Sequence, residues 1–394
     1  MTDQGSEYPL AGLKVLDFSR VLAGPFAGRM LSDLGADVVK VEPPDGDITR
    51  LWGKVVGGVP GYFHQQNAGK RDICIDLRAP GAKSLVLDLV RKADILVENY
   101  RPDVMPRLGL GYDVLSAVNP GLIMLSISGF GQGGPESRRP AYAPIVHAEL
   151  GLMARAARRG NLPHSELPLS VADTNASLHG LVAVLAAVHL RQRTARGQHI
   201  DMAMVDATLV TDDQIHYELE DSEDAMSLPN DVWETGAGPI LVSADFRHLW
   251  RRLTGDLGLA DPGGDDLAAK IARRRAATAA CFLALADWPA VETAMERMNI
   301  AWGQVRAGKD LREQPTLRSR GSILDIDDRA GGTRPIPQSP YRFSAARAGV
   351  RGPAPHRGEH NAEVLGEWLG LSGEDVAALT EDGVLGRAEA DQPA

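Results

Sequence analysis

Residues 9–47 read PLAGLKVLDFSRVLAGPFAGRMLSDLGADVVKVEPPDGD, and their pattern predicts a strand, a helix and a second strand. The run LKVLDFS, residues 13–19, contains β-branched and aromatic residues and is typical of a strand. In FAGRMLSDLG, residues 26–35, apolar side chains recur at helical spacing, and the last glycine ends the helix. The strand VVKVE, residues 38–42, completes a βαβ unit, whose parallel connection is expected to be right-handed.

The same alternation of strands and helices continues along the first half of the chain. DILVEN, residues 94–99, and LIMLSIS, residues 122–128, are continuous apolar runs, as in strands buried on both faces. GAKSLVLDLVRKA, residues 81–93, predicts an amphipathic helix between them. We therefore predict an α/β fold with a doubly wound parallel sheet. The longest helical pattern covers residues 174–194, and HIDMAMV, residues 199–205, predicts a further strand.

A chain of 394 residues is long enough for about two domains. The expected division is a large domain over residues 1–215, a linker with a small domain over 216–325, and a tie with a C-terminal helix over 326–394. The acidic run YELEDSED, residues 217–224, reads as a solvated linker. The small domain is expected to hold one strand, PILVSAD at 239–245, and several helices. Residues 329–355 are rich in proline and glycine and predict an extended segment that returns to the large domain.

Composition excludes several broad classes of protein. The net charge of -10 argues against a general binder of nucleic acid or anionic membranes, yet permits a polyanionic small ligand held by local arginines. Cys74 and Cys281 are too few for a disulfide framework or a CxxC-type zinc site, which indicates a reducing compartment. The N-terminal residues lack the pattern of a signal peptide, and the longest clean apolar run, residues 181–188, is shorter than the ~20 residues that span a bilayer. We expect a soluble cytoplasmic protein without a membrane segment.

General ligand-binding and catalytic motifs are mostly missing. RVLAGP, residues 20–25, takes the place of a GxGxxG fingerprint after the first strand, and GxxxxGK[ST], HExxH and GxSxG are absent. GFGQGG, residues 129–134, follows a predicted strand. On its pattern alone, this segment is equally a mobile loop or a ligand cradle.

Basic and amide residues follow several predicted strands. These are Arg20, Arg78, Asn99, Arg101 and, slightly further on, Arg107. The carboxyl ends of strands form the ligand crevice of an open α/β sheet, and arginines can grip phosphates there with two hydrogen bonds. For any single arginine, ordinary surface charge is the more common explanation. Only the set as a whole favours a phosphate-bearing ligand.

Asp173, in SVADTNASLHG at residues 170–180, is the one carboxylate that stands out. An aspartate in front of a helical run is most often the N-cap of the helix. A helix N-terminus also keeps a carboxylate ionised, as a carboxylate nucleophile requires. The local pattern permits both interpretations.

Over nearly its whole length, the sequence resembles the class III CoA-transferases of the CaiB/BaiF type, which include formyl-CoA:oxalate, carnitine and bile-acid CoA-transferases. The resemblance is carried, in family order, by the segment 9–47 and by GKRDICIDLR, ADILVENYRPDVMPRLGLGYDVL, NPGLIMLSISGFGQGGP, VADTNASLHG, TARGQHIDMAMVDATL, PQSPYRFS and GEHNAEVL. It implies a large Rossmann-like domain with a parallel sheet and a smaller inserted α+β domain. It also implies an interlocked homodimer, in which each chain threads through a ring made by the other.

The resemblance also implies functional residues and a reaction. The nucleophilic aspartate of the family corresponds to Asp173, and an active-site tyrosine corresponds to Tyr142. Coenzyme A contacts are implied for Arg20, Val21, Leu22, Ala23, Ile75, Asp76, Leu77, Arg78, Asn99, Tyr100, Arg101 and Arg107. The implied enzyme moves CoA from an acyl-CoA donor to a free carboxylic acid through an aspartyl mixed anhydride and an aspartyl-CoA thioester. This chemistry needs neither a metal nor a nucleotide redox cofactor.

Two departures from the family pattern bear on substrate and gating. Ala143 stands where relatives often have an acid, and Leu22 stands where oxalate-specific members have glutamine, so a larger or more apolar acid than oxalate is expected. Residues 208–235 are short for the family, and TGAG at 235–238 is a poor substitute for the glycine-rich loop that shields the intermediate in some members.

Three other functions stay open. An α-methylacyl-CoA racemase shares the fold but needs a histidine near position 142, where Tyr142 stands, while His147 lies five residues further on. An intramolecular CoA-transferring isomerase would use the same aspartate chemistry. A non-catalytic CoA-binding protein would retain only the binding residues.

Overall fold

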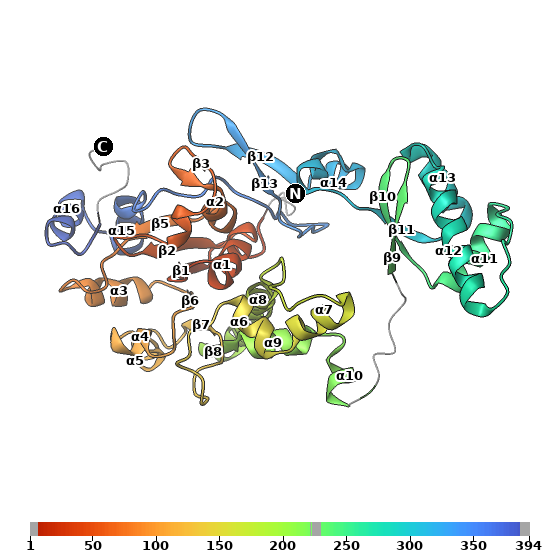
Figure 1. Ribbon diagram of the computed structural model, residues 1–394. Helices are drawn as coiled ribbons and strands as arrows, with labels where there is room; N and C mark the ends of the chain where they lie inside the picture. The colour runs from red at the N-terminus through yellow and green to blue at the C-terminus, as the bar shows by residue number, and fades with distance from the viewer. Residues whose placement is uncertain (1–6, 221, 223–229, 387–394) are drawn as a thin grey trace. The chain divides into compact units, whose positions relative to one another are not determined.

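The computed structural model of the chain describes residues 7–220, 222 and 230–386. It consists of two compact units (Figure 1). Unit 1 contains the described residues up to Asp213 and from Ser319 onward, and unit 2 runs from Gln214 to Arg318. The predicted acidic linker begins inside helix α10 (Ile215–Leu219), and its residues 221, 223 and 224 lie outside the described part of the chain.

Unit 1 is built on a six-stranded sheet in the order β5-β2-β1-β6-β7-β8, and every neighbouring pair is parallel (Figure 1). Its strands are β1 (Lys14–Asp17), β2 (Asp37–Glu42), β5 (Arg71–Cys74), β6 (Ile95–Glu98), β7 (Ile123–Ser128) and β8 (Gln198–Ala203). The strand order reverses direction between β1 and β6. In open α/β sheets, ligands bind at this position, outside the carboxyl ends of the strands.

Helices cover both faces of this sheet. One layer contains α1 (Ala23–Asp33), α6 (Ala143–Glu149), α8 (Val171–Thr194) and α9 (Met204–Thr211), and the other contains α3 (Ala82–Val90), α5 (Tyr112–Val118) and α15 (Asn361–Leu369). Successive strand residues point to opposite faces, so Val15 enters the first core and Leu16 the second. The predicted α/β class with a parallel sheet is confirmed.

Shorter elements complete unit 1. They are the 3-10 helix η1 (Ile48–Leu51), β3 (Val55–Val56), β4 (Val59–Pro60), α2 (Gly61–Asn67), α4 (Val104–Arg107), α7 (Leu152–Gly160), β12 (Ile323–Asp327), β13 (Thr333–Pro337) and α16 (Gly373–Glu381).

The start of α8 differs from the prediction. The helix begins at Val171 rather than at residue 174, its N-cap is Ser170, and Asp173 is the third residue of its first turn. The interpretation of Asp173 as an N-cap is therefore wrong. The Ser170 side chain makes no capping hydrogen bond, so the first turn depends on groups from elsewhere in the fold.

Helix α8 is also the one described helix that is long and apolar enough to cross a membrane by length and composition alone, with a mean hydropathy of 1.4 in its most apolar window. Counting only the uninterrupted apolar run missed this, because the helix continues on both sides of residues 181–188. Its residues Leu181, Val184 and Ala187 are buried in the first core against the sheet, as in the core helix of a globular fold.

Unit 2 contains a three-stranded antiparallel sheet in the order β11-β10-β9. Its elements are α10, β9 (Asn230–Thr235), β10 (Gly238–Ser243), α11 (Phe246–Asp256), α12 (Leu267–Leu283), α13 (Trp288–Met298), β11 (Ala301–Gln304), the 3-10 helix η2 (Gly308–Glu313) and α14 (Pro315–Ser319). The prediction of a single strand is wrong. β9 (NDVWET) and β11 (AWGQ) are short and interrupted by polar residues or glycine, so they lack the continuous apolar run that marks β10.

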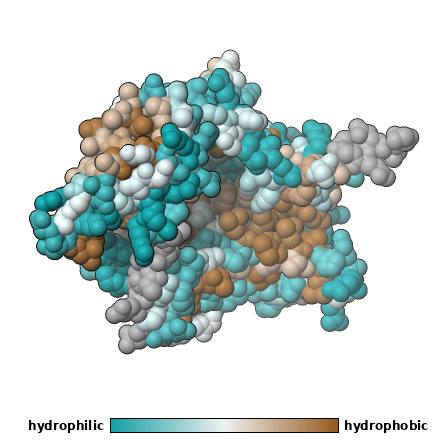
Figure 2. Space-filling view, turned by 90° about the vertical axis from the view of Figure 1, so that its right-hand side faces the viewer, coloured by the Kyte–Doolittle hydropathy of each residue, from teal (hydrophilic) through white to brown (hydrophobic). Residues whose placement is uncertain are grey.

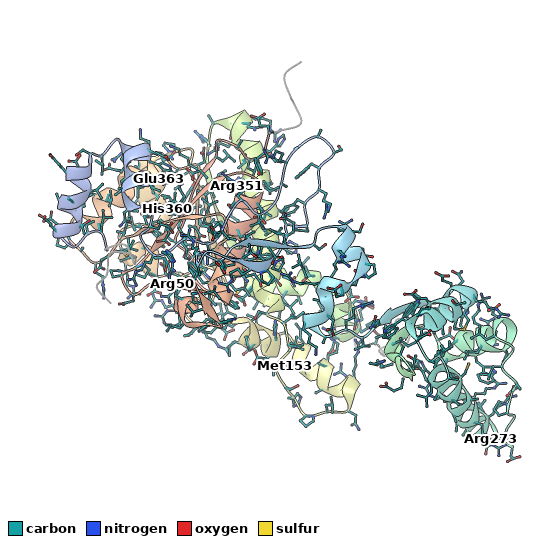
Figure 3. The ribbon with its side chains drawn as sticks, turned by 90° about the horizontal axis from the view of Figure 1, so that it is seen from above. Arg50, Met153, Arg273, Arg351, His360 and Glu363 are labelled. Atoms are coloured by element: carbon teal, nitrogen blue, oxygen red, sulfur yellow. The ribbon has the colours of Figure 1, made fainter. Side chains whose placement is uncertain are left out.

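The C-terminal segment returns to unit 1 by specific contacts. Arg351 donates to the Ala36 carbonyl at 2.9 Å, and the His360 N–H donates to the Asp72 carbonyl at 2.9 Å. Arg351, His360 and Glu363 can be followed over this unit in Figure 3. The predicted terminal helix is α15, whereas the hairpin β12–β13 and helix α16 were not predicted.

Candidate active site

A cavity of about 450 Å³ lies where β1, β6 and β7 end in unit 1. Its lining brings together the predicted residues Arg20, Val21, Ala23, Asn99, Tyr100, Arg101, Tyr142 and Asp173. Segments far apart in the sequence meet here because the parallel strands deliver their following loops to one edge of the sheet.

The other predicted coenzyme A contacts do not line this cavity. They are Leu22, Ile75, Asp76, Leu77, Arg78 and Arg107. Ile75 is fully buried and forms an isolated bridge with Leu385, while Arg78 is exposed and pairs with Asp76 at 3.0 Å. The exposed guanidinium of Arg107 pairs with an acid of its own helix turn, at 3.1 Å. A contact of these residues with CoA stays a prediction.

The Asp173 side chain lies at the inner wall of the cavity. The residue is only 8% exposed, and this burial raises the pKa of its carboxyl group to about 6. The backbone N–H groups of Ala143 and Ala23 lie close enough to the carboxylate to oppose this rise in the pKa. Both belong to the first residue of a helix, so their N–H groups have no partner inside the helix.

This environment suits a carboxylate nucleophile. With a pKa of about 6, the Asp173 carboxyl is mostly ionised at neutral pH but is more basic than an exposed aspartate. N–H groups close to the carboxylate could also stabilise an oxyanion formed beside it. The Ser177 hydroxyl donates to the carbonyls of Ala23 and Asp173 and thereby joins α1 to α8.

The turn after β1 is held by an amide side chain from the neighbouring strand. Asn99 accepts the Arg20 N–H and donates to the Arg20 carbonyl, each at 2.8 Å. The Arg20 guanidinium lies 5.7 Å from the centre of the Tyr100 ring. The predicted role of Asn99 as a direct ligand contact therefore competes with an evident role in fixing this turn.

Several residues near Asp173 were missed by sequence reasoning. Ser137, Arg139 and Met204 line the cavity. Burial together with the negative charges of Asp173 and Asp47 raises the pKa of the Tyr62 phenol to about 12, which places this phenol within electrostatic reach of Asp173. Tyr62 packs edge-on against Trp52, with ring centres 5.2 Å apart. No local sequence pattern connects α2 with α8.

His147, the candidate base of the racemase alternative, has a different partner. It is buried, and its Nε2 accepts the N–H of Ala172 at 3.2 Å. Burial lowers the pKa of its ring, so the neutral form that can accept this hydrogen bond is favoured. The ring does not line the cavity. It satisfies one of the free donors at the start of α8.

The glycine-rich segment after β7 is tied to the sheet at its base. Gly129 lines the cavity, the Gly131 N–H donates to Ser128 Oγ at 3.1 Å, and the Gln132 N–H donates to Asp201 at 3.0 Å. The segment TGAG, residues 235–238, is the turn between β9 and β10 of unit 2. Within the described ranges, no group of three or more His, Cys, Asp or Glu side chains is arranged to hold a metal ion.

Unit 1 thus combines a parallel sheet, a cavity at its strand ends, arginines in the cavity lining and a buried carboxylate, the features expected from the sequence. The family model described as CoA-transferase family III matches residues 10–361. The chain therefore belongs to CoA-transferase family III and is an enzyme of this class.

Relatives and solved structures agree with this assignment. The chain is 33% identical to a succinate–glutarate CoA-transferase of Agrobacterium fabrum, over 93% of this chain and 98% of the relative. It is 31% identical to a succinyl-CoA–D-citramalate CoA-transferase of Chloroflexus aurantiacus, over 98% of this chain and 100% of the relative. The crystal structure of a CAIB/BAIF family protein from Brucella suis matches with a TM-score of 0.77 and 31% identity, covering 92% of this chain and 100% of that one.

Proposed function

We propose that this enzyme transfers CoA from an acyl-CoA donor to a free carboxylic acid, with Asp173 as the covalent nucleophile. The observation that carries the proposal is the Asp173 carboxylate, which is buried at the cavity wall close to the N–H groups of Ala23 and Ala143. The large domain of the proposed enzyme is Rossmann-like, and the middle of the chain forms the smaller inserted domain.

In the first half-reaction, an Asp173 oxygen attacks the thioester carbonyl of the donor. The C–S bond breaks, which gives an aspartyl mixed anhydride and the CoA thiolate. The thiolate then attacks the aspartyl carbonyl, the donor leaves as a free carboxylate, and an aspartyl-CoA thioester remains.

In the second half-reaction, the same two steps run in reverse with a new acid. An oxygen of the acceptor carboxylate attacks the aspartyl thioester and releases the thiolate, which gives a second mixed anhydride. The thiolate attacks the acceptor carbonyl, and the new acyl-CoA leaves while Asp173 regains its carboxylate. Every intermediate retains one activated acyl group, as an anhydride or a thioester, so the mechanism requires neither ATP nor a metal.

Mass spectrometry tests this mechanism directly. The protein is incubated with an acyl-CoA, digested at mildly acidic pH and searched for a CoA adduct on the peptide that contains Asp173. Asp173→Ala should form no adduct and lose transferase activity. Asp206→Ala is the matched control, because Asp206 is also an acid in the first turn of a helix but is exposed. Full activity of Asp173→Ala would end the proposal.

The acceptor is proposed to be a dicarboxylic acid larger than oxalate. Two of the similar enzymes are named for succinate with glutarate and for D-citramalate, which are dicarboxylic acids. The cavity offers Arg139, whose guanidinium could pair with a distal carboxylate, although it already contacts Glu136 and Glu149.

A panel of acyl-CoA donors and labelled acids separates the transferase from the racemase and the isomerase. Label exchange into acyl-CoA marks intermolecular transfer, loss of an α-proton marks a racemase, and rearrangement of a single acyl-CoA marks an isomerase.

The enzyme is further proposed to be a cytoplasmic homodimer, interlocked as its family resemblance implies, and to bind neither nucleic acid nor membranes. Figure 2 shows a broad hydrophobic patch on one face of the molecule. In unit 1, exposed apolar side chains gather on the packed pair α8 and α9, including Leu178, Val182 and Val210. Static light scattering should give twice the mass of the chain, and Val182→Glu should shift it toward the monomer.

A further inference from the structure

The turn between β1 and α1 has a backbone conformation that its own residues do not favour. Val21 has a φ of 67°, in the left-handed region, where a β-branched residue is a rare outlier. Such a conformation persists only when the surrounding structure holds it. The turn lines the cavity and leads directly into Ala23, whose N–H lies close to the Asp173 carboxylate.

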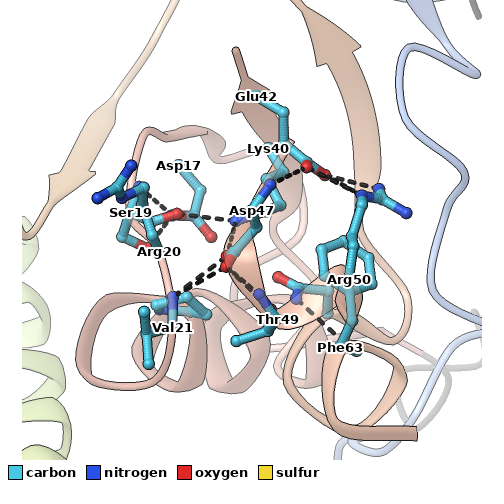
Figure 4. A network of polar contacts seen from close by, with 12 residues as sticks. Asp17, Ser19, Arg20, Val21, Lys40, Glu42, Asp47, Thr49, Arg50 and Phe63 are labelled. Carbon is cyan, nitrogen blue, oxygen red and sulfur yellow. Dashed lines mark hydrogen bonds and ion pairs between the residues drawn. The ribbon is translucent and has the colours of Figure 1, made fainter. Parts of the chain in front are cut away.

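Buried charged side chains that do not line the cavity hold this turn (Figure 4). Lys40 of β2 donates to the Ser19 carbonyl at 2.7 Å. Asp47, in the loop after β2, accepts the Val21 N–H at 3.1 Å through Oδ2. Together with the Asn99 contacts described above, these bonds satisfy the successive backbone groups of the turn.

Asp47 is itself fixed on every side. Its Oδ1 accepts the N–H of Thr49 at 3.0 Å and the Thr49 hydroxyl at 2.9 Å, while its Oδ2 also accepts Lys40 at 3.2 Å. Its own N–H donates to Glu42 at 2.7 Å. The residue is only 2% exposed and does not line the cavity, so it has no direct access to a substrate there.

We propose that Asp47 is a positioning residue of the transferase, because it holds Val21 in the left-handed conformation. This conformation has two effects: it places the Ala23 N–H beside the Asp173 carboxylate, and it fixes the part of the cavity wall formed by Arg20 and Val21. The part that concerns Asp173 rests on the proposed function. The part that concerns the wall predicts an effect on CoA affinity, which does not depend on a covalent mechanism.

A purely structural role would make Asp47 equivalent to other buried carboxylates of the same charge cluster. Asp72 is the matched control, because it is fully buried and also acts electrostatically on Lys40. Its carboxylate, however, accepts the Gly358 N–H of the C-terminal segment at 2.6 Å and does not contact the turn.

The experiment compares Asp47→Ala with Asp72→Ala, each alone and combined with Val21→Gly. The measurements are kcat, the dissociation constant of CoA by calorimetry, and the thermal midpoint. Both single variants should lose stability. Only Asp47→Ala should also lower kcat and weaken CoA binding, by about tenfold to hundredfold, the factor that corresponds to the strain of one unfavourable backbone conformation.

Glycine adopts the left-handed conformation without strain, so adding Val21→Gly should restore much of the lost kcat and CoA affinity to Asp47→Ala. It should restore nothing to Asp72→Ala. If Asp47→Ala does not fold, Asp47→Asn replaces it. The amide has the same size as the carboxylate, but in either orientation its NH₂ group faces hydrogen-bond donors, those of Val21 and Lys40 or those of Thr49. We therefore expect a smaller loss of kcat and CoA affinity than in Asp47→Ala, with the same recovery when Val21→Gly is added.

Equal losses of kcat in Asp47→Ala and Asp72→Ala, or no recovery from Val21→Gly, would overturn the proposal. The two proposals fail in distinguishable ways. Absence of an Asp173 adduct in the wild type would reject the covalent mechanism, whereas the CoA affinities of the four variants would still test the role of Asp47.

Discussion

The N–H of Ala172 donates to the Nε2 of His147 at 3.2 Å, so a buried imidazole on α6 satisfies a donor in the first turn of α8, directly beside Asp173. The Ser170 side chain makes no such bond. The neutral ring thus takes over the function of an N-cap and joins α6 to α8 next to the cavity, which is lined by Asp173 of α8 and by Tyr142, the N-cap of α6.

Replacing His147 should separate hydrogen bonding from packing. His147→Phe fills the same space but leaves the Ala172 N–H without an acceptor, which should cost about 1–3 kcal/mol of unfolding free energy. His147→Gln can accept through its amide oxygen and should lose less. Urea unfolding measures both, and equal stabilities of the two variants would show that the contact contributes nothing.

The same contact predicts a dependence on pH. Burial lowers the pKa of His147 below its ordinary value of 6.5, so the unfolded chain takes up the proton first as the pH falls. The contribution of His147 is complete above pH 6.5 and is lost as the pH falls from 6.5 through the lower pKa of the folded protein. Between pH 7.5 and 5.5, the wild type should therefore lose more stability than His147→Gln, in which this group cannot titrate.

Asp173 should favour activity at the expense of stability. Burial raises the pKa of its carboxyl from 3.8 to about 6, so the unfolded chain loses this proton at a lower pH than the folded protein. The free energy of unfolding therefore falls as the pH rises from 3.8 to about 6, and it stays lower above pH 6. Two pKa units correspond to about 3 kcal/mol as an upper limit, because one unit is about 1.4 kcal/mol. Asp173→Asn should be inactive, yet more stable than the wild type at pH 7.5. Below pH 4 this stability difference should vanish.

The acid limb of the wild-type rate profile should follow the same group. The reaction requires the Asp173 carboxylate, so kcat/KM should fall below a midpoint near pH 6. A midpoint near pH 4, where an exposed aspartate titrates, would show that the nucleophile is not this buried group.

Local periodicity is the reason why the βαβ unit at the start of the chain could be predicted. β1, α1 and β2 each carry their own apolar pattern, and the structure places them within a few residues of the expected bounds. The start of α8 could not be predicted, because one of its free donors is satisfied by His147 and Ser170 makes no side-chain cap. The left-handed Val21 could not be predicted either, since valine disfavours that conformation and only tertiary contacts impose it.

The same distinction applies to the site. Arg20, Asn99 and Arg101 were recognisable because they follow strands, and a parallel sheet brings such positions together. Tyr62 lies on the short helix α2, whose position relative to Asp173 is set by packing alone. Residues of this second kind become visible only when the fold is known.

Tyr62 gives a prediction that concerns the reacting carboxylate. The negative charge of Asp173 contributes to the raised pKa of the Tyr62 phenol, so the two groups interact electrostatically. The dipole of the Tyr62 hydroxyl therefore also acts on the charge that forms or disappears at Asp173 during the reaction. Tyr62→Phe keeps the ring against Trp52 and removes only the hydroxyl. We expect kcat to fall about tenfold while the dissociation constant of CoA stays within twofold. A kcat unchanged in Tyr62→Phe would assign the residue to packing alone.

Arg101 and Arg107 test whether the cavity or the longer set of predicted contacts describes the CoA site. Arg101 lines the cavity, whereas Arg107 lies outside it and is paired with Asp103. A charge-assisted bond to a phosphate contributes about 1.5–3 kcal/mol, so Arg101→Ala should weaken CoA binding about tenfold or more and reduce its sensitivity to salt. Arg107→Ala should change the affinity less than twofold, because its charge is already partly neutralised. Calorimetry at two salt concentrations measures both variants. An equal loss in both would mean that bound CoA extends beyond the cavity to Arg107, as the family resemblance implies.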